Sequence, residues 1–219
     1  MTVSRRQLLA AGAAAGTALT AGCTGFLSDT LSSTRATVSQ AALDETGYDE
    51  HTVETVVIER TVGRFGIERT IEVENWYAEY DRAVSLDALG LSRVQGAVVA
   101  VLTTPQISFL GKTFNPVGEY STDELVALIQ DRYDQLENVR SVGESSISIL
   151  GTETTLARYE ANARLTSAGT SLDVYLQLSE PVAHGEDFVI CVAVYPQVVG
   201  LETESESVRT MLSSLEHGD

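Results

Sequence analysis

The sequence predicts an α+β domain in which helices cover an antiparallel sheet, as in an α/β/α sandwich. Several segments alternate apolar and polar residues with a period of two, which is typical of half-buried strands. Residues 97–102 and 188–195 are apolar at every position, which favours central strands covered on both faces. Three amphipathic segments with helix signals lie before, between and after the strands. This order of elements favours the α+β class.

Each expected helix has its own boundary signal. Residues 39–46 are followed by a glycine, which suits a left-handed C-cap. Ser121 and Glu124 form a capping box for the middle helix, and Thr203 and Glu206 form one for the C-terminal helix. The apolar stripe expected for the middle helix consists of Leu125, Leu128, Ile129, Tyr133 and Leu136.

The expected strands begin with a hairpin of residues 53–62 and 67–80. Residues 156–166 and 172–178 alternate in the same way and should form further strands. In the second hairpin strand the apolar residues share one face and the polar residues the other: Ile67, Ile71, Val73 and Tyr77 against Glu68, Thr70, Glu72 and Glu74.

The N-terminus carries export signals. Arg5 and Arg6, followed by two leucines, resemble a twin-arginine motif, and the small residues before Cys23 resemble a lipobox. The apolar stretch at 8–21 is 14 residues long, whereas a spanning helix needs about 20. We therefore expect residues 1–22 to be a twin-arginine signal peptide and Cys23 to become the lipidated N-terminus.

Three regions follow from this interpretation. Residues 1–22 are the signal peptide, and residues 23–35 combine the lipidated cysteine with a Ser/Thr-rich flexible tether. Residues 36–219 are expected to form a single domain, long enough to bury a core. The protein is then anchored to the cell membrane through Cys23, on its extracytoplasmic face.

The charge composition is typical of a protein from a high-salt environment. The chain has 31 acidic and 14 basic residues, a net charge of −17 that becomes −19 once Arg5 and Arg6 are removed, and Lys112 is its single lysine. Molar salt screens repulsion between carboxylates beyond about 3 Å. An acidic face for a cationic partner is the alternative, but the acids are spread along the chain. The charge also argues against nucleic acid as a partner.

The residues of common catalytic and metal sites form no recognisable pattern. His51, His184 and His217 are far apart in the sequence and lack metal-ligand spacing. Cys191 lies in an apolar run, so a buried thiol is expected rather than a nucleophile. We therefore expect no metal, no cofactor and no enzymatic activity.

Two segments are candidate contact sites. The loop at 105–116 carries more apolar bulk than loops usually do, and either covers the core or forms a contact surface. Arg158 and Arg164 share one face of a strand and could bind an anion, although a solvated face with ion pairs also explains them. The residues proposed for the contact loop are Ile107, Phe109, Leu110, Lys112 and Phe114.

Two resemblances rest on these features. The chain resembles an uncharacterised family of haloarchaeal lipoproteins. The resemblance rests on the export signal, the lipobox cysteine, the segment at 42–48 and Asn75-Trp76-Tyr77. It implies a location for the protein but no activity. From Ser121 onward, the order of helix, strands and helix resembles the PsbP-like α/β/α fold, which implies architecture alone.

Three functions remain open at this point. The favoured one is a non-enzymatic, membrane-tethered binding or assembly module with an unidentified protein partner. The second is a small-ligand carrier with a pocket between sheet and helices. The third is a hydrolase with an unfamiliar site. A deep pocket with converging polar groups would favour the second or third function, and an apolar patch on a charged surface the first.

The export signals generate the first prediction. Cys23→Ser should remove the lipid but not the export signal, so the protein should appear in the medium when fractions are probed by immunoblot. Arg5→Lys combined with Arg6→Lys should instead trap the precursor inside the cell. A Cys23→Ser protein that stays with the membrane would contradict lipidation, and normal export of the double variant would contradict the twin-arginine signal.

Overall fold

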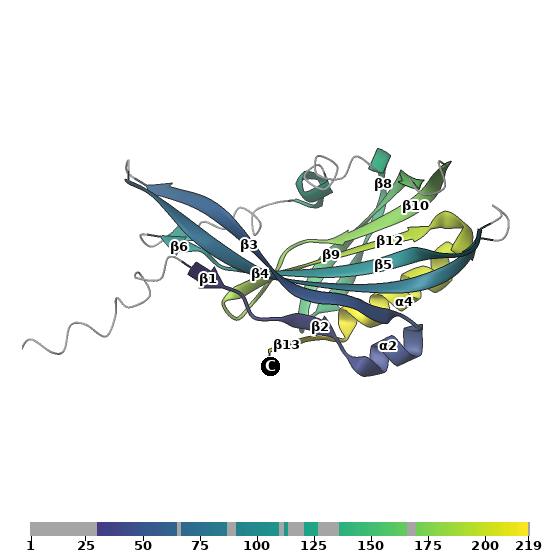
Figure 1. The fold of residues 1–219 in the computed structure, drawn as a ribbon, viewed down its shortest axis with the longest axis horizontal. Helices are drawn as coiled ribbons and strands as arrows, with labels where there is room; N and C mark the ends of the chain where they lie inside the picture. The colour runs from purple at the N-terminus through teal and green to yellow at the C-terminus, as the bar shows by residue number, and fades with distance from the viewer. Residues whose placement is uncertain are drawn as a thin grey trace, which may run out of the picture.

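A large β-sheet dominates the chain in the computed structural model (Figure 1). The structure describes residues 30–64, 67–86, 91–109, 112–113, 121–126, 136–165 and 170–218. The elements are β1 (Thr30–Ser32), β2 (Ala36–Val38), α2 (Gln40–Thr46), β3 (Asp49–Arg64), β4 (Ile67–Leu86), β5 (Leu91–Pro105), β6 (Ser108–Phe109), β7 (Lys112–Thr113), β8 (Leu136–Ile149), β9 (Thr152–Leu165), β10 (Thr170–Ser179), β11 (Val182–His184), β12 (Asp187–Pro196), η4 (Gln197–Val199), α4 (Leu201–Ser213) and β13 (Leu215–His217).

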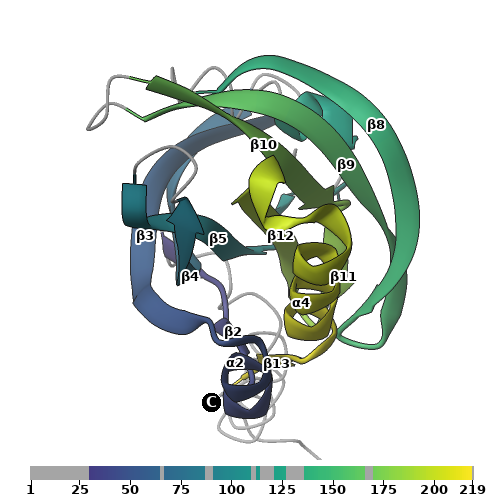
Figure 2. The same cartoon turned by 90° about the vertical axis from the view of Figure 1, so that its right-hand side faces the viewer.

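The main sheet has nine strands and mixed pairing. Its path runs β1-β4-β5-β12-β10-β9-β8, with β3 on the other side of β4 and β11 beside β12. Every pair is antiparallel except β1 with β4, which is parallel. The sheet curls strongly around α4, so the helix lies in its hollow (Figure 2). Two small sheets, β2 with β13 and β6 with β7, complete the described strands.

The central strands are buried on both faces. On the hollow side, Val208, Met211 and Leu212 of α4 are fully buried in a core shared with Tyr195 and Ile149. On the other side, the helical turn at 122–126 packs on Leu176, Leu178 and Ile190. This double burial explains why β5 and β12 are apolar at successive positions, as their sequences indicate.

The predicted fold class, an α/β/α sandwich of the PsbP-like kind, is wrong. The described residues are predominantly strand, the sheet is mixed, and helices cover only part of it. The largest error concerns residues 136–149, because Leu136 begins β8 instead of ending a helix. β8 is an edge strand whose first ten residues are mostly exposed, so it lacks the alternation by which strands are recognised.

Local helix signals were only partly reliable. Gly47 ends α2 with a left-handed φ of 70°, and the Ser121–Glu124 capping box is present, with Ser121 N donating to Glu124 Oε2 at 2.8 Å. The second predicted capping box is wrong. α4 begins at Leu201, because Gly200 is its N-cap. Among the described residues, no helix is long and apolar enough to span a bilayer.

The segment just before the domain lies in the sheet. β1 pairs with β4 at residues 72–74, immediately beyond the point where β5 pairs with Trp76. Buried Ser33 holds this junction, since its hydroxyl donates to Thr103 O at 2.9 Å and accepts from Trp76 N at 3.2 Å. The tether expected at 23–35 therefore contacts the fold from residue 30 onward.

This junction generates the second prediction. Ser33→Ala should lower the free energy of unfolding by about 1–3 kcal/mol, because it leaves the buried carbonyl of Thr103 and the half-buried N–H of Trp76 without their partner. The matched control is Ser32→Ala, since Ser32 makes only an exposed bond to Glu74 at 2.7 Å and should be nearly neutral. Urea unfolding followed by circular dichroism measures both. Equal losses would show that the Ser33 bridge contributes nothing specific.

Candidate functional site

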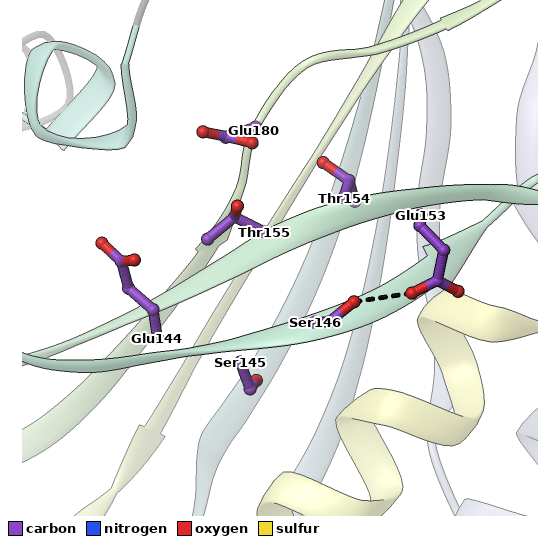
Figure 3. Close-up of a pocket in the computed structure, with 7 residues that line it drawn as sticks. All are labelled: Glu144, Ser145, Ser146, Glu153, Thr154, Thr155 and Glu180. Atoms are coloured by element: carbon purple, nitrogen blue, oxygen red, sulfur yellow. Dashed lines mark hydrogen bonds between the residues drawn. The ribbon is translucent and has the colours of Figure 1, made fainter.

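An open depression lies where β8, β9 and the end of β10 meet (Figure 3). Its volume is about 460 Å³, and hydroxyl and carboxylate groups dominate its lining. The lining residues are Glu144, Ser145, Ser146, Glu153, Thr154, Thr155 and Glu180. Because it is wide and polar, it resembles a hydrated surface more than a ligand pocket.

The groups in this depression do not form a catalytic set. Ser146 Oγ donates to Glu153 Oε2 at 2.6 Å, and Arg209 Nη2 donates to Ser146 O at 2.7 Å. A serine nucleophile needs an adjacent base that is itself oriented by a third group, and these contacts supply no such chain. No group of three or more His, Cys, Asp or Glu in the described residues is placed to hold a metal ion.

A second depression, of about 290 Å³, occupies the exposed strand face where anion binding was predicted. Its charged groups neutralise one another. Arg140 forms an ion pair with Glu160, and Asn162 Nδ2 donates to Asp173 Oδ1 at 2.6 Å. A guanidinium already held by a carboxylate is a poor anion site.

The two predicted anion ligands lie apart. Arg164 is exposed and pairs with Glu137 at 2.8 Å. Arg158 lies opposite Gln177 in the register and is partly covered. Six residues separate the two arginines, about 20 Å along a strand. The structure therefore does not bring them together.

The five residues of the predicted contact loop have three different outcomes: one is buried, two belong to a short strand pair, and two lie outside the described residues. Ile107 is buried and packs with Ile71 and Val73 in a small separate core. Phe109 and Lys112 are paired in the β6–β7 hairpin. Leu110 and Phe114 lie outside the described residues. Core cover therefore holds for Ile107.

Two histidines that are distant in the sequence meet at one end of the sheet. His217 Nε2 lies 3.0 Å from Asp187 Oδ2, and the rings of His217 and His184 are 4.9 Å apart. Asp187 Oδ2 also accepts from Thr34 N at 2.8 Å. Sequence spacing gave no hint of this group, because 33 residues separate the histidines. Asp187 is buried, so the group ties Thr34 and His217 to β12.

A buried charged group joins α2 and α4 to β4. Glu204 of α4 is 1% exposed, accepts from Tyr48 Oη at 2.6 Å and forms an ion pair with Arg82. Arg82 also donates to Thr46 O at 3.0 Å, at the end of α2, and its guanidinium lies 5.3 Å from the centre of the Tyr48 ring. Sequence analysis missed this group, since Glu204 is one of several glutamates at the start of α4.

Burial changes the acidity of several groups. It raises the pKa of Tyr48 far above its ordinary value of 10, and the hydrogen bond to Glu204 adds to the rise. Burial also raises the pKa of Tyr195 to about 12. The pKa of Cys191 rises to about 12 for the same reason, so its thiol is protonated and unreactive near neutral pH. The expectation of a buried thiol is confirmed.

Residues 35–216 match the family described as "Domain of unknown function (DUF6517)". The chain belongs to this family. The match begins after β1 and includes the Glu204 group and His184, and it ends one residue before His217. The description of DUF6517 assigns no activity to its members.

Comparison with other proteins adds little to this assignment. No curated protein matches the chain. One similar solved structure is PA94 of Pseudomonas aeruginosa, itself a protein of unknown function. It is 10% identical over 64% of this chain and 84% of PA94, with a TM-score of 0.32. A similarity this weak carries no argument about the DUF6517 domain.

The buried tyrosines generate the third prediction. The unfolded state loses tyrosine protons near pH 10, whereas the folded DUF6517 domain keeps them, so stability should fall as the pH rises above 10. Tyr48→Phe should reduce this slope by up to about 1.4 kcal/mol per pH unit. Urea unfolding between pH 8 and 11 measures it. Identical slopes above pH 10 would contradict the neutral, buried state of Tyr48.

Proposed function

We propose that this DUF6517 protein is a haloarchaeal lipoprotein, exported by the twin-arginine route and held through Cys23 on the extracytoplasmic face of the cell membrane. Arg5 and Arg6 supply the export signal, and the small residues before Cys23 supply the lipidation signal. The excess of acids and the single lysine support a high-salt environment. At its membrane, the domain acts as a non-enzymatic binding or assembly module.

The observation that carries this proposal is the exposed outer strand of the β3–β4 hairpin. β3 pairs with β4 on one edge, and its other edge has no strand partner within the described residues. Residues 54–57 of β3 are exposed in succession, and Val57 is 56% exposed while Val56 is 37% exposed. Unpaired backbone groups beside apolar side chains can accept a strand from another protein.

The remainder of β3 is protected against uncontrolled pairing. Charged residues and bulges are the usual protection of an edge strand. β3 carries Glu54 and Glu59 on either side of the valines, and its register shifts between Glu50 and Thr52. Among the residues of β3 whose side chains are described, the stretch between Glu54 and Glu59 is therefore the open part of the edge, which suits one specific partner strand better than aggregation.

The other two functions have weaker support. A ligand carrier would use an enclosed, mainly apolar cavity, whereas both depressions in the described residues are polar and open. A hydrolase would need a nucleophile with an oriented base, and the Ser146–Glu153 contact provides a hydroxyl without one.

The edge generates the fourth prediction. Val57→Glu should remove apolar contact and repel a partner strand, while leaving the melting temperature nearly unchanged because Val57 is exposed. The protein is extracted from membranes in mild detergent, and its complex is sized by native electrophoresis. We expect wild type to migrate as a complex and Val57→Glu as a single chain.

The opposite edge of the sheet provides the control. Val142 of β8 is 42% exposed, so Val142→Glu introduces the same charge at a comparable exposed valine. It should keep the complex. A wild-type protein that migrates as a single chain, or a complex that survives Val57→Glu, would contradict binding through β3.

A further inference from the structure

The direction of the backbone groups of β3 follows from contacts of its neighbour β4. In an antiparallel pair, opposite residues alternate between pairs that exchange both backbone hydrogen bonds and pairs whose groups point away from each other. Glu74 is opposite Val57, and its carbonyl accepts from Ser33 N at 3.0 Å, on the β1 side of β4. The backbone groups of Glu74 therefore point away from β3, and those of Val57 point to the open edge.

Two further contacts agree with this direction. Trp76, opposite Thr55, donates its N–H to Ser33 Oγ at 3.2 Å, so the backbone groups of Thr55 also point to the open edge. The carbonyl of Val56 accepts from a side chain of β4 at 3.1 Å and so points the other way. The alternation then places the groups of Glu59 on the open edge as well. Within the described residues, β3 thus presents the backbone of residues 55, 57 and 59 without a strand partner.

The side chains of this stretch are apolar in the middle and acidic at both ends. Val56 and Val57 are exposed, and Ile58 is half-buried. Glu54 and Glu59 flank them and are exposed. A stretch of this length, about 20 Å, is typical of a strand in a sheet. Residues 54–59 can therefore accept one short strand.

The stretch is complementary to itself in one antiparallel register. Residues with outward-pointing groups must meet each other, so the twofold axis between two copies of β3 has to pass through a residue. An axis at Val57 places Val57 opposite itself and Val56 opposite Ile58 of the second copy. An axis at Val56 would place Glu54 opposite Ile58. An axis at Ile58 would place Glu59 opposite Val57. Of these three, the axis at Val57 is the one that keeps carboxylates from facing apolar side chains.

Charge does not oppose this register, and the contact does not depend on charge. Glu59 is opposite Thr55, and Glu54 is opposite position 60, which is an arginine in the sequence, so no two carboxylates face each other. Two full chains, each with a net charge of −17, repel each other at low salt. Molar salt shortens the screening length to about 3 Å, and backbone hydrogen bonds and apolar contacts persist there. High salt therefore favours the pairing.

We infer that the partner strand of β3 is β3 of a second copy, so that two DUF6517 chains form a twofold-symmetric dimer whose sheets join at Val57. This inference rests on the proposed binding function of the β3 edge. A strand contact of six residues is short, and the proposed anchoring through Cys23 supports it. Two copies held in one membrane have a higher effective concentration than two copies free in solution.

Disulfide crosslinking in isolated membranes tests the dimer. Val57→Cys places one thiol of each copy at the twofold axis, where the two Cα atoms should be about 5.5 Å apart, within the range of roughly 4.4–6.8 Å for a disulfide. Cys191 is buried, and the sulfur of Cys23 should carry lipid, so the added cysteine is the reactive one. After oxidation with copper phenanthroline in molar KCl, we expect a reducible band at twice the mass of the mature chain.

Two variants separate the register from chance collision. Thr55→Cys lies on the same exposed edge, but its two copies should be four residues out of register, about 13 Å apart along the strand. Val142→Cys lies on β8, where the side chain is 42% exposed. Both should remain at the mass of one chain. The Val57→Cys band should weaken when KCl is lowered to the minimum that keeps the native circular dichroism, because repulsion between the copies is then less screened.

Three results would overturn the inference. They are the absence of the double-mass band from Val57→Cys, an equal band from Thr55→Cys, or a band that strengthens as KCl is lowered. If Val57→Cys gives no such band although Val57→Glu abolishes the native complex, β3 binds a different protein, and the proposed function stands without self-pairing. A native complex that survives Val57→Glu would instead contradict both. Failure of the dimer and failure of the proposed function are therefore distinguishable.

Discussion

The buried carboxylate of Glu204 constrains more of this structure than any other single group. An unpaired charge in a protein core is costly, so Glu204 is compatible with the fold only where Tyr48 and Arg82 both reach it. Tyr48 follows α2, Arg82 belongs to β4, and Glu204 belongs to α4. The position of each helix on the sheet is thereby fixed by one polar group as well as by apolar packing. The nearby bonds from Gln177 to Tyr195 and Ser205, both at 3.0 Å, tie α4 to β10 and β12.

β4 connects this core to a second, smaller one. Over residues 76–86 it pairs with β5 in the main sheet, and over residues 72–74 it pairs with β1. The outer part packs Ile71 and Val73 with Ile107, away from both helices. One long strand thus carries a rigid domain at one end and a projecting hairpin at the other (Figure 1). The open edge of β3 at residues 54–57 lies at the base of this projecting part, opposite residues 74–77 of β4.

Sequence patterns predicted the elements that bury one face, and they did not predict the elements that are mostly exposed. The predicted faces of the hairpin strand are confirmed at residues 71–74, since Ile71 and Val73 are buried while Glu72 and Glu74 are not. Farther along the strand Tyr77 is only half-buried, and its neighbour Ala78 is buried instead. β8 was missed because an exposed edge strand need not alternate. Arg158 and Arg164 were grouped by period alone, but Arg158 is partly covered, whereas Arg164 is exposed and pairs with Glu137. The predicted fold class was wrong because the spacing of apolar residues indicates which faces of a segment are buried. That spacing does not indicate how much of the sheet the helices cover.

The sequence by itself determined the charge balance, the helix caps at Ser39–Gly47 and Ser121–Glu124, and the apolar character of β5 and β12. These features depend on composition or on residues within one or two helical turns. Only the tertiary structure decided that Glu204 meets Tyr48 and Arg82, that His184 lies beside His217, and that β1 runs parallel to β4. Each of these contacts joins residues 33 or more positions apart. Their partners are selected by the packing of the whole chain, which local patterns do not encode.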